Sequence, residues 1–440
     1  MASKRGGTRP PDTDDPPRVR RFVATRTEVE GREETKIVEL PDRNPEPWST
    51  DEALHIVGKR VPRMDALEKV TGRARYTADI RRPGMLHAAI VRSPVAAGRL
   101  VALDLAPALA LPGVRGALTA SEVAGIETSS GPLFDHMITY AGQPLCAVCA
   151  DSRGIAAAAA AAVRLSIDET PHAVTAALAL ADGAPSVRPG GNRSKNSPRV
   201  IGRGDPDAAL RAADVVLTRE YRTPVALHSA LETHGAVAEW EADRVTVWES
   251  TQGIFNTRSD VAEAFGLRLS QVRVQTDYMG GGFGAKNGAA TGTYIAVALA
   301  RKLGRPVLCM FDREGEQLDA GNRPATIQRV TLGARRDGTL TAIVLDATVP
   351  LGIAGWQAGP GAIYRELYAC ENVRTSETFV YINTSAMSAF RGPGHTEGAF
   401  GLESAMNSTS FHPKSFDSLM DQKFQHLLQF KFINFFINLN

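Results

Sequence analysis

The sequence predicts an α+β fold, with a compact α/β unit followed by a second unit of mixed sheets and helices. Strands and helices alternate from about residue 56 to residue 171, and short strands bounded by turn residues follow after residue 205. Residues 181–205, rich in Gly, Pro and Ser, separate the two. The chain has 440 residues, 43% of them hydrophobic, which is enough for two or three domains with separate cores.

Charge and composition narrow the classes of partner. The formal net charge is +2, which gives no indication of a nucleic-acid partner. No apolar run reaches the roughly 18 residues that a membrane span needs, and no apolar segment follows the N-terminal arginines as it would in a signal peptide. Four cysteines are too few for a disulfide scaffold. We therefore expect a cytoplasmic protein with no membrane and no nucleic-acid partner.

The first unit contains one Ala-rich segment, residues 152–165, whose composition strongly favours a helix. We also expect a helix over residues 97–111, and strands over residues 73–80, 84–93, 144–150 and 164–170.

Cys146 and Cys149 form a CxxC within an apolar run. On a strand, residues three apart point to opposite faces, so the two sulfurs would not converge on a metal. We interpret both as core residues, together with Cys309 and Cys370.

The second unit contains a glycine-rich loop, residues 280–287, between an alternating strand and a long apolar helix. Glycines at such a junction indicate close approach of the backbone to a ligand. Before this loop we expect a helix over residues 257–267. The strands expected around it are residues 215–223, 235–242, 244–250 and 305–314, and a hairpin within 325–349 that turns at Asp337 and Gly338.

The loop does not match a P-loop. That motif needs Gly before its Lys and Ser or Thr after it, whereas Ala285 precedes Lys286 and Asn287 follows it. The pattern of residues 280–285 fits a dinucleotide fingerprint better, with Asp312 as the acidic residue. However, Asp312 lies further along the chain than the acidic residue of that fingerprint usually does. The bulky Phe283 side chain also stands where the pyrophosphate should lie. A tight turn without a ligand is the third interpretation.

A second loop combines an aromatic residue, an arginine and glycines in "AFRGPGHTEG", residues 389–398. Two such loops could present backbone N–H groups to one bulky anionic cofactor from two sides. A third segment contains His228, Glu232 and Gln252.

These segments together resemble one family. "GQPLCAVCAD", "HSALETHGAVAEW", "VWESTQG", "GGGFGAK" and "AFRGPGHTEGAFGLESAMN" are similar, in order and spacing, to motifs of the molybdenum hydroxylases. This is the xanthine dehydrogenase and aldehyde oxidase family, and the match is to its large molybdopterin-binding subunit. Residues 57–80 resemble the start of its a/b hammerhead domain. The resemblance extends from about residue 56 to residue 407.

The resemblance implies an oxidoreductase that hydroxylates an aldehyde or N-heterocycle with oxygen derived from water. Its cofactor would be molybdenum–molybdopterin, for which the cytosine dinucleotide is one alternative form. An iron–sulfur small subunit and an FAD-binding medium subunit would be partners carrying 2Fe–2S clusters and FAD. Export together with a partner is an alternative to the cytoplasmic location.

Site residues are also implied by the resemblance. The cofactor-binding residues would be Gln252, Gly281, Gly282, Phe283, Gly284, Phe390, Arg391 and Gly392. Asn287 and Pro393 would line the substrate pocket. No side chain would ligate molybdenum, because the pterin dithiolene holds it.

Some residues depart from the family pattern. Purine-oxidising members have Glu and Phe in place of Asn287 and Pro393, so we expect an aldehyde or another heterocycle as substrate. Ala226 replaces a Gln found in many members. The loop before Arg391 lacks the cysteine of carbon monoxide-oxidising members.

No catalytic residue is assigned. The family's catalytic Glu lies in a more C-terminal motif, and Glu397 and Glu403 belong to a different one. We therefore expect the chain to be an N-terminal, truncated part that is inactive alone. The alternatives are an NAD(P)-dependent dehydrogenase that uses residues 280–285 and a non-catalytic assembly or binding protein.

The expected domain organisation has five parts. Residues 1–50 form a disordered tail, 51–175 the hammerhead domain, 176–205 a linker and 206–407 an incomplete first cofactor-binding domain. Residues 408–440 lack Gly, Ala, Arg and Val but hold seven of the 16 phenylalanines. They are either an amphipathic helix or the product of translation past a disrupted gene junction.

Overall fold

The computed structural model describes residues 21–29, 32–40, 48–49, 51–128 and 130–410, and the chain divides into two units after Ala74. In the first unit, β1 (Arg21–Val29) and β2 (Arg32–Leu40) form an antiparallel hairpin, and α1 spans Ala66–Val70. The prediction of a disordered tail is wrong for these strands, because their alternating Thr, Val and Ile residues favour strand pairing.

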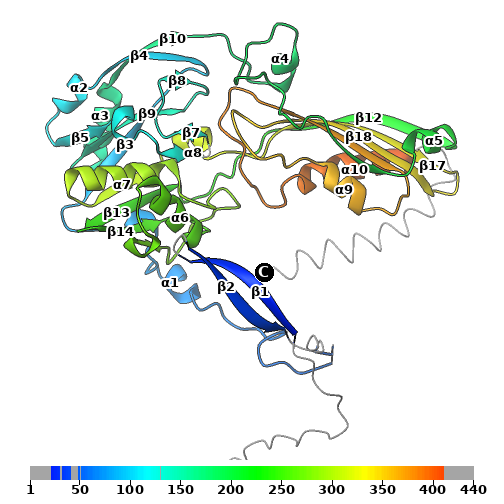
Figure 1. Cartoon of the computed structure of the whole chain (residues 1–440), viewed down its shortest axis with the longest axis horizontal. Coiled ribbons are helices and arrows are strands. Elements are labelled where there is room, and N and C mark those ends of the chain that lie inside the picture. The colour runs from blue at the N-terminus through cyan, green and yellow to red at the C-terminus, as the bar shows by residue number, and fades with distance from the viewer. Residues whose placement is uncertain (1–20, 30–31, 41–47, 50, 129, 411–440) are drawn as a thin grey trace, which may run out of the picture. The chain divides into compact units, whose positions relative to one another are not determined.

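A seven-stranded mixed sheet forms the larger part of the second unit (Figure 1). Its order is β15-β14-β13-β16-β3-β9-β5, with β14–β15 and β16–β3 parallel and the other pairs antiparallel. The strands are β3 (Leu86–Arg92), β5 (Val114–Leu118), β9 (Pro144–Ala150), β13 (Gly235–Glu241), β14 (Arg244–Glu249), β15 (Val272–Gln275) and β16 (Val307–Met310). The two predicted domains thus share one sheet.

Helices cover both faces of this sheet. The apolar α7 (Thr291–Leu303) packs on one face with Ala147 and Cys149, and it ends at Gly304 with φ of 61°. On the opposite face, Val148 packs against α3 (Arg153–Ala162). Three further helices belong to the segments that form this sheet: α2 (Ala106–Leu109), α6 (Ile254–Ala264) and α8 (Arg313–Asp319).

The cysteine prediction is confirmed. Cys146 and Cys149 lie on β9, whose residues are all buried, and all four cysteines are buried and free. Burial raises the pKa of the Cys146, Cys149 and Cys309 thiols to about 12. These thiols are therefore core groups rather than nucleophiles or ligands.

The second large sheet has the order β11-β19-β18-β17-β12, with only β18 and β19 parallel among its described pairs. Its face carries α9 (Gly361–Glu366) and α10 (His395–Ser410), which bury Tyr364, Leu402 and Met406 (Figure 1). The strands are β11 (Arg199–Arg203), β12 (Val215–Thr223), β17 (Thr326–Ala334), β18 (Leu340–Pro350) and β19 (Val373–Val380), and α5 spans Pro206–Arg211.

Smaller elements correct three predictions. Residues expected to be helical form β4 (Gly98–Asp104), which pairs with β10 (Arg164–Glu169) and β8 (Met137–Ile138). Tertiary pairing overrides the local helix propensity there. The strand expected over residues 73–80 is absent from the described structure, which has a 3₁₀ turn at Thr77–Asp79. The predicted linker contains α4 (Ala176–Leu180) and the paired strand β11.

The described part of the chain has no helix that is long and apolar enough to cross a bilayer. A two-stranded ladder, β6 (Glu127–Thr128) with β7 (Gly131–Pro132), lies outside the main sheets. Residues 411–440, and with them both interpretations of the C-terminal segment, lie outside the described residues. The α+β prediction is confirmed by the mixed sheets and their helices.

Candidate functional site

The first glycine loop, residues 280–287, joins β15 to α7 and has an unusual backbone. Gly281 and Gly284 have φ of 101° and 111°, and Phe283 has φ of 54°. A bulky residue at positive φ costs roughly 1 kcal/mol or more and persists only where its surroundings enforce it. Phe283 is 49% exposed, so burial of its ring does not offset the strain. This combination indicates a backbone shaped for binding.

Side chains hold the loop at both ends. Gly280 donates its N–H to the Glu232 carboxylate at 2.7 Å, and Gly284 donates to Gln252 Oε1 at 2.8 Å. The backbone N–H of Gln252 donates to the carbonyl of Lys286 at 2.7 Å. The side-chain NH₂ of Gln252 has no hydrogen-bond partner among the described residues, so it can donate to a ligand beside the loop.

The second glycine loop, residues 389–394, meets the first directly. Arg391 donates its backbone N–H to the Phe283 carbonyl at 3.0 Å. A Cβ on Gly284 would lie 2.5 Å from the carbonyl oxygen of Ala389, so glycine is required there by the contact between the loops. Gly392 has φ of 67°. The structure therefore brings together all the loop residues that the sequence analysis assigned to the cofactor.

An aromatic contact supports this junction. The Phe390 ring lies 4.5 Å from the His228 ring and 6.3 Å from the Phe283 ring, measured between centroids. His228 Nε2 lies 2.7 Å from the Ala389 carbonyl and donates to it. Burial lowers the pKa of His228, which favours the neutral ring. His228 thus anchors the second loop.

Arg323 is a site residue that the sequence analysis missed. Its guanidinium donates to the carbonyls of Phe390 and Arg391 at 2.7 and 2.6 Å and pairs with Glu397 at 3.0 Å. It also lies 4.8 Å over the Phe390 ring. The only sequence signal was an arginine within the turn "GNRP", which does not reveal a contact nearly 70 residues away.

The tips of the loops leave backbone donors available. Within the described structure, the N–H groups of Gly281, Gly282 and Phe283 donate no hydrogen bond to the protein, although Gly282 is buried. A buried N–H without a partner is rare in folded proteins. These donors therefore fit a ligand that supplies acceptor atoms at this position.

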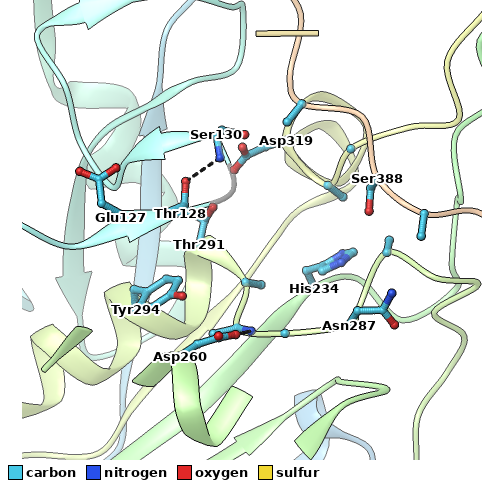
Figure 2. A pocket seen from close by; sticks show the side chains of 18 of the residues that line it. Glu127, Thr128, Ser130, His234, Asp260, Asn287, Thr291, Tyr294, Asp319 and Ser388 are labelled. Carbon is cyan, nitrogen blue, oxygen red and sulfur yellow. Dashed lines mark hydrogen bonds between the residues drawn. The ribbon is translucent and has the colours of Figure 1, made fainter. Parts of the chain in front are cut away.

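A cavity of about 800 Å³ lies beside the first loop (Figure 2). Residues 284–285 and 287–290 form one wall, and Ser388 belongs to the segment that leads into the second loop. Asn287, predicted to line the substrate pocket, thus faces a cavity. Pro393 is not among the described lining residues, and its substrate role stays a prediction.

The charged groups of this cavity are carboxylates. Glu127, Asp260 and Asp319 line it (Figure 2). Glu263 also lines it, and no lysine or arginine is among its described lining residues. Asp319 is compensated by Arg92 Nη1 at 2.8 Å and by the Tyr140 hydroxyl at 2.7 Å. Among the described residues, Asp260 accepts a single hydrogen bond, from the backbone N–H of Ala289 at 2.8 Å. The cavity therefore has a net acidic lining.

Comparison with known proteins decides the family. Residues 191–412 match the molybdopterin cofactor-binding domain, and residues 71–171 match the a/b hammerhead domain of aldehyde oxidase and xanthine dehydrogenase. This chain belongs to the xanthine dehydrogenase and aldehyde oxidase family. Both glycine loops lie within the matched molybdopterin cofactor-binding domain, and the family's cofactor is molybdenum–molybdopterin.

Individual relatives cover most of this chain. The molybdenum-binding subunit PaoC of an aldehyde oxidoreductase from Escherichia coli O157:H7 is 31% identical over 80% of this chain and 48% of its own length. The large molybdopterin subunit of nicotinate dehydrogenase from Eubacterium barkeri is 30% identical over 80% of this chain and 85% of its own length. The chain thus spans about half the length of several curated relatives, and most of one.

The fold agrees with solved structures of the family. Quinoline 2-oxidoreductase from Pseudomonas putida 86 superposes with a TM-score of 0.75 at 27% identity, over 80% of this chain and 48% of that one. The aldehyde oxidoreductase of Desulfovibrio gigas superposes with a TM-score of 0.71 at 27% identity, over 80% and 41% of the two chains. The predicted hammerhead and cofactor-binding architecture is therefore confirmed.

Proposed function

We propose that this chain is part of a molybdenum hydroxylase that oxidises an aldehyde or N-heterocycle with oxygen derived from water. The observation that carries the proposal is the junction of the two glycine loops, with free N–H groups at Gly281, Gly282 and Phe283. Gln252, Phe390, Arg391 and Gly392 would complete the cofactor wall. When bound, molybdenum–molybdopterin would supply the redox chemistry, and the chain would hold and orient it.

Backbone donors suit this task because they stabilise negative charge without titrating. The neutral ring of His228 and the largely buried Arg323 keep the second loop in place, so the donors would need no rearrangement when the cofactor binds. The cytosine dinucleotide form of the cofactor, an iron–sulfur small subunit and an FAD-binding medium subunit are part of the same proposal. The family resemblance supports them.

The substrate class follows from the cavity beside Asn287. Its carboxylates repel an anionic substrate and attract a cation, while a neutral ring can use the amide and hydroxyl groups. We therefore place neutral and amine-bearing aldehydes or heterocycles ahead of carboxylate-bearing ones. Asn287 also lacks the acidic side chain that purine-oxidising members have at this position, which agrees with a substrate other than a purine.

We also propose that the chain alone does not turn over substrate. PaoC and quinoline 2-oxidoreductase each extend over about twice the matched length, and the resemblance assigns the catalytic carboxylate to the part not matched here. Turnover would then need the remainder of the cleft in addition to the residues matched here. The nicotinate dehydrogenase subunit is matched over 85% of its own length.

The alternatives have less support. As a dinucleotide site, residues 280–285 would need Asp312 for a ribose, but Asp312 caps α8 by accepting the Gly315 N–H at 2.7 Å. The dinucleotide fingerprint belongs to a βαβ unit, in which the strands before and after the helix are neighbours. Here β15 and β16, which precede and follow α7, are separated in the sheet by β14 and β13. A non-catalytic assembly role is favoured only if the chain co-purifies with iron–sulfur and flavin chains but without molybdenum.

The test is co-expression of the chain with iron–sulfur, flavin and candidate completing chains, followed by measurement of molybdenum content and dye reduction. Benzaldehyde, 4-carboxybenzaldehyde and 4-(trimethylammonio)benzaldehyde form a matched substrate series. We expect bound molybdenum, turnover only in the complex, and preference for the neutral and cationic aldehydes. Absence of molybdenum from every preparation would overturn the function, and preference for the carboxylate would overturn the substrate class alone.

A further inference from the structure

Lys286 belongs to the glycine loop but points away from its exposed tip. The side chain is 1% exposed, and its Nζ donates to the Glu232 carbonyl at 2.7 Å and to Ser250 Oγ at 2.6 Å. A buried ammonium is costly unless it is hydrogen-bonded and near a counter-charge. Ser250 in turn donates to Glu232 Oε2 at 2.8 Å, so a carboxylate lies one hydroxyl away.

Glu232 connects this ammonium to the first residue of the loop. Its Oε2 accepts the Gly280 N–H at 2.7 Å, and its Oε1 accepts the Thr77 N–H at 3.1 Å. At the other end of the loop, the Lys286 carbonyl accepts the Thr251 hydroxyl at 3.0 Å. Glu232 thus binds both ends of the loop, and residues 250–252 bind the end near Lys286.

Arg323 holds the second loop by hydrogen bonds, as Lys286 holds the first. Its side chain is 11% exposed, and it binds the carbonyls of Phe390 and Arg391 while pairing with Glu397. In a trans peptide the N–H points opposite to the C=O. Because the Arg391 carbonyl faces Arg323, the N–H of Gly392 faces away from it.

From these contacts we infer that Lys286 and Arg323 are positioning residues, a buried and a largely buried cation that hold the two glycine loops so that their free N–H groups face the cofactor. The inference rests on the proposed function for the identity of that cofactor, but the positioning of the loops can be measured without it. Lys286 makes no hydrogen bond to Gly281, Gly282 or Phe283, and Arg323 binds the second loop through the carbonyls of Phe390 and Arg391, on the side away from the Gly392 N–H.

Hydrogen exchange of the full chain tests the positioning. Arg323→Lys keeps the charge but replaces the planar guanidinium, whose Nη1 binds Glu397 and whose Nη2 binds both carbonyls, with a single ammonium nitrogen of different geometry. We expect amide exchange in residues 389–394 to accelerate roughly tenfold or more, while exchange of β17 and β18 stays unchanged. Arg329→Lys, at an exposed position on β17, is the matched control. Unchanged exchange in Arg323→Lys would overturn the inference for the second loop.

The first loop is tested with Lys286→Met, with exposed Lys195→Met as the control. We expect at least tenfold faster exchange in residues 280–287. Should Lys286→Met not fold, Ser250→Ala removes the hydroxyl that links Lys286 to Glu232 and is expected to accelerate the same amides. Normal exchange in the folded variant would overturn the inference for this loop.

Molybdenum content provides the second measurement, on chain co-expressed with the partner chains described above. Folded Arg323→Lys and Lys286→Met are expected to retain less than a third of the wild-type molybdenum at a melting temperature within a few degrees. A purely structural role would lower stability and molybdenum together, and that result would overturn positioning. A wild-type chain without molybdenum would instead overturn the proposed function, and exchange would still decide the positioning.

Discussion

Glu249 makes the stability of this chain depend on pH in a predictable direction. The side chain ends β14, is 1% exposed, and accepts Thr293 Oγ1 at 2.7 Å and the Ala290 N–H at 3.1 Å through Oε1. Its Oε2 is buried without a hydrogen-bond partner among the described residues. Burial raises the pKa of this carboxyl from 4.5 to about 7.

The sign and size follow from proton linkage. Below pH 4.5 the carboxyl is protonated in both the folded and the unfolded chain, so it does not affect the difference between them. Between 4.5 and about 7 the folded state retains a proton that the unfolded state has lost, so the free energy of unfolding falls as pH rises. The full loss, above pH 7, is about 3 kcal/mol.

Glu249→Gln removes the charge and keeps the shape, so the variant should lose this pH dependence. With an unfolding entropy of about 2 cal/mol/K per residue, a chain of 440 residues converts about 3 kcal/mol into a melting-temperature difference of about 3 °C. We expect the melting temperature of Glu249→Gln, relative to the wild type, to be about 3 °C higher at pH 8 than at pH 5.

Thermal melts of both proteins at pH 5 and pH 8 measure this difference. Glu366→Gln, at an exposed position at the end of α9, is the matched control and should show the same offset at both pH values. An offset for Glu249→Gln that is equal at pH 5 and pH 8 would refute the reasoning, because the carboxyl would then not be held protonated by burial.

Two further predictions concern the loop junction and the cysteines. Gly284→Ala places a Cβ at a φ of 111° and 2.5 Å from the Ala389 carbonyl, so we expect a loss of roughly 2 kcal/mol or more in unfolding free energy and faster amide exchange in both loops. Gly266→Ala, where the Cβ meets open space at φ of 63°, controls for backbone strain alone. The buried thiols of Cys146 and Cys149 should not react with a disulfide reagent in native protein, but should do so in denaturant; rapid native reaction would contradict their core role.

Much of the site could be predicted from the sequence because the features that identify it are each contained in a few consecutive residues. Glycines between a strand and an apolar helix permit a loop with positive φ, and the order of five motifs identifies the family. The apolar run around Cys146 also determines a buried strand, since such a run has no polar face to present to water.

Tertiary structure decided what depends on partners distant in the sequence. The segment Gly98–Asp104 has the composition of a helix but forms a strand because β10 and β8 pair with it. Likewise, β16 pairs with β3 across more than 200 residues, which merges two predicted domains into one sheet. No local pattern encodes such pairings, because they depend on surfaces that exist only after the chain has folded.

The positions of Lys286 and Arg323 behind the two loops also depend on partners distant in the sequence. The sequence by itself determined where two glycine-rich loops with backbone freedom lie, since that freedom is a property of the residues themselves, and it predicted a cofactor beside them. Only the tertiary structure decided that Lys286 turns inward to Glu232 and that Arg323 binds the carbonyls of Phe390 and Arg391. A charged side chain has no intrinsic direction, and its position is set by the partners that the fold places within reach.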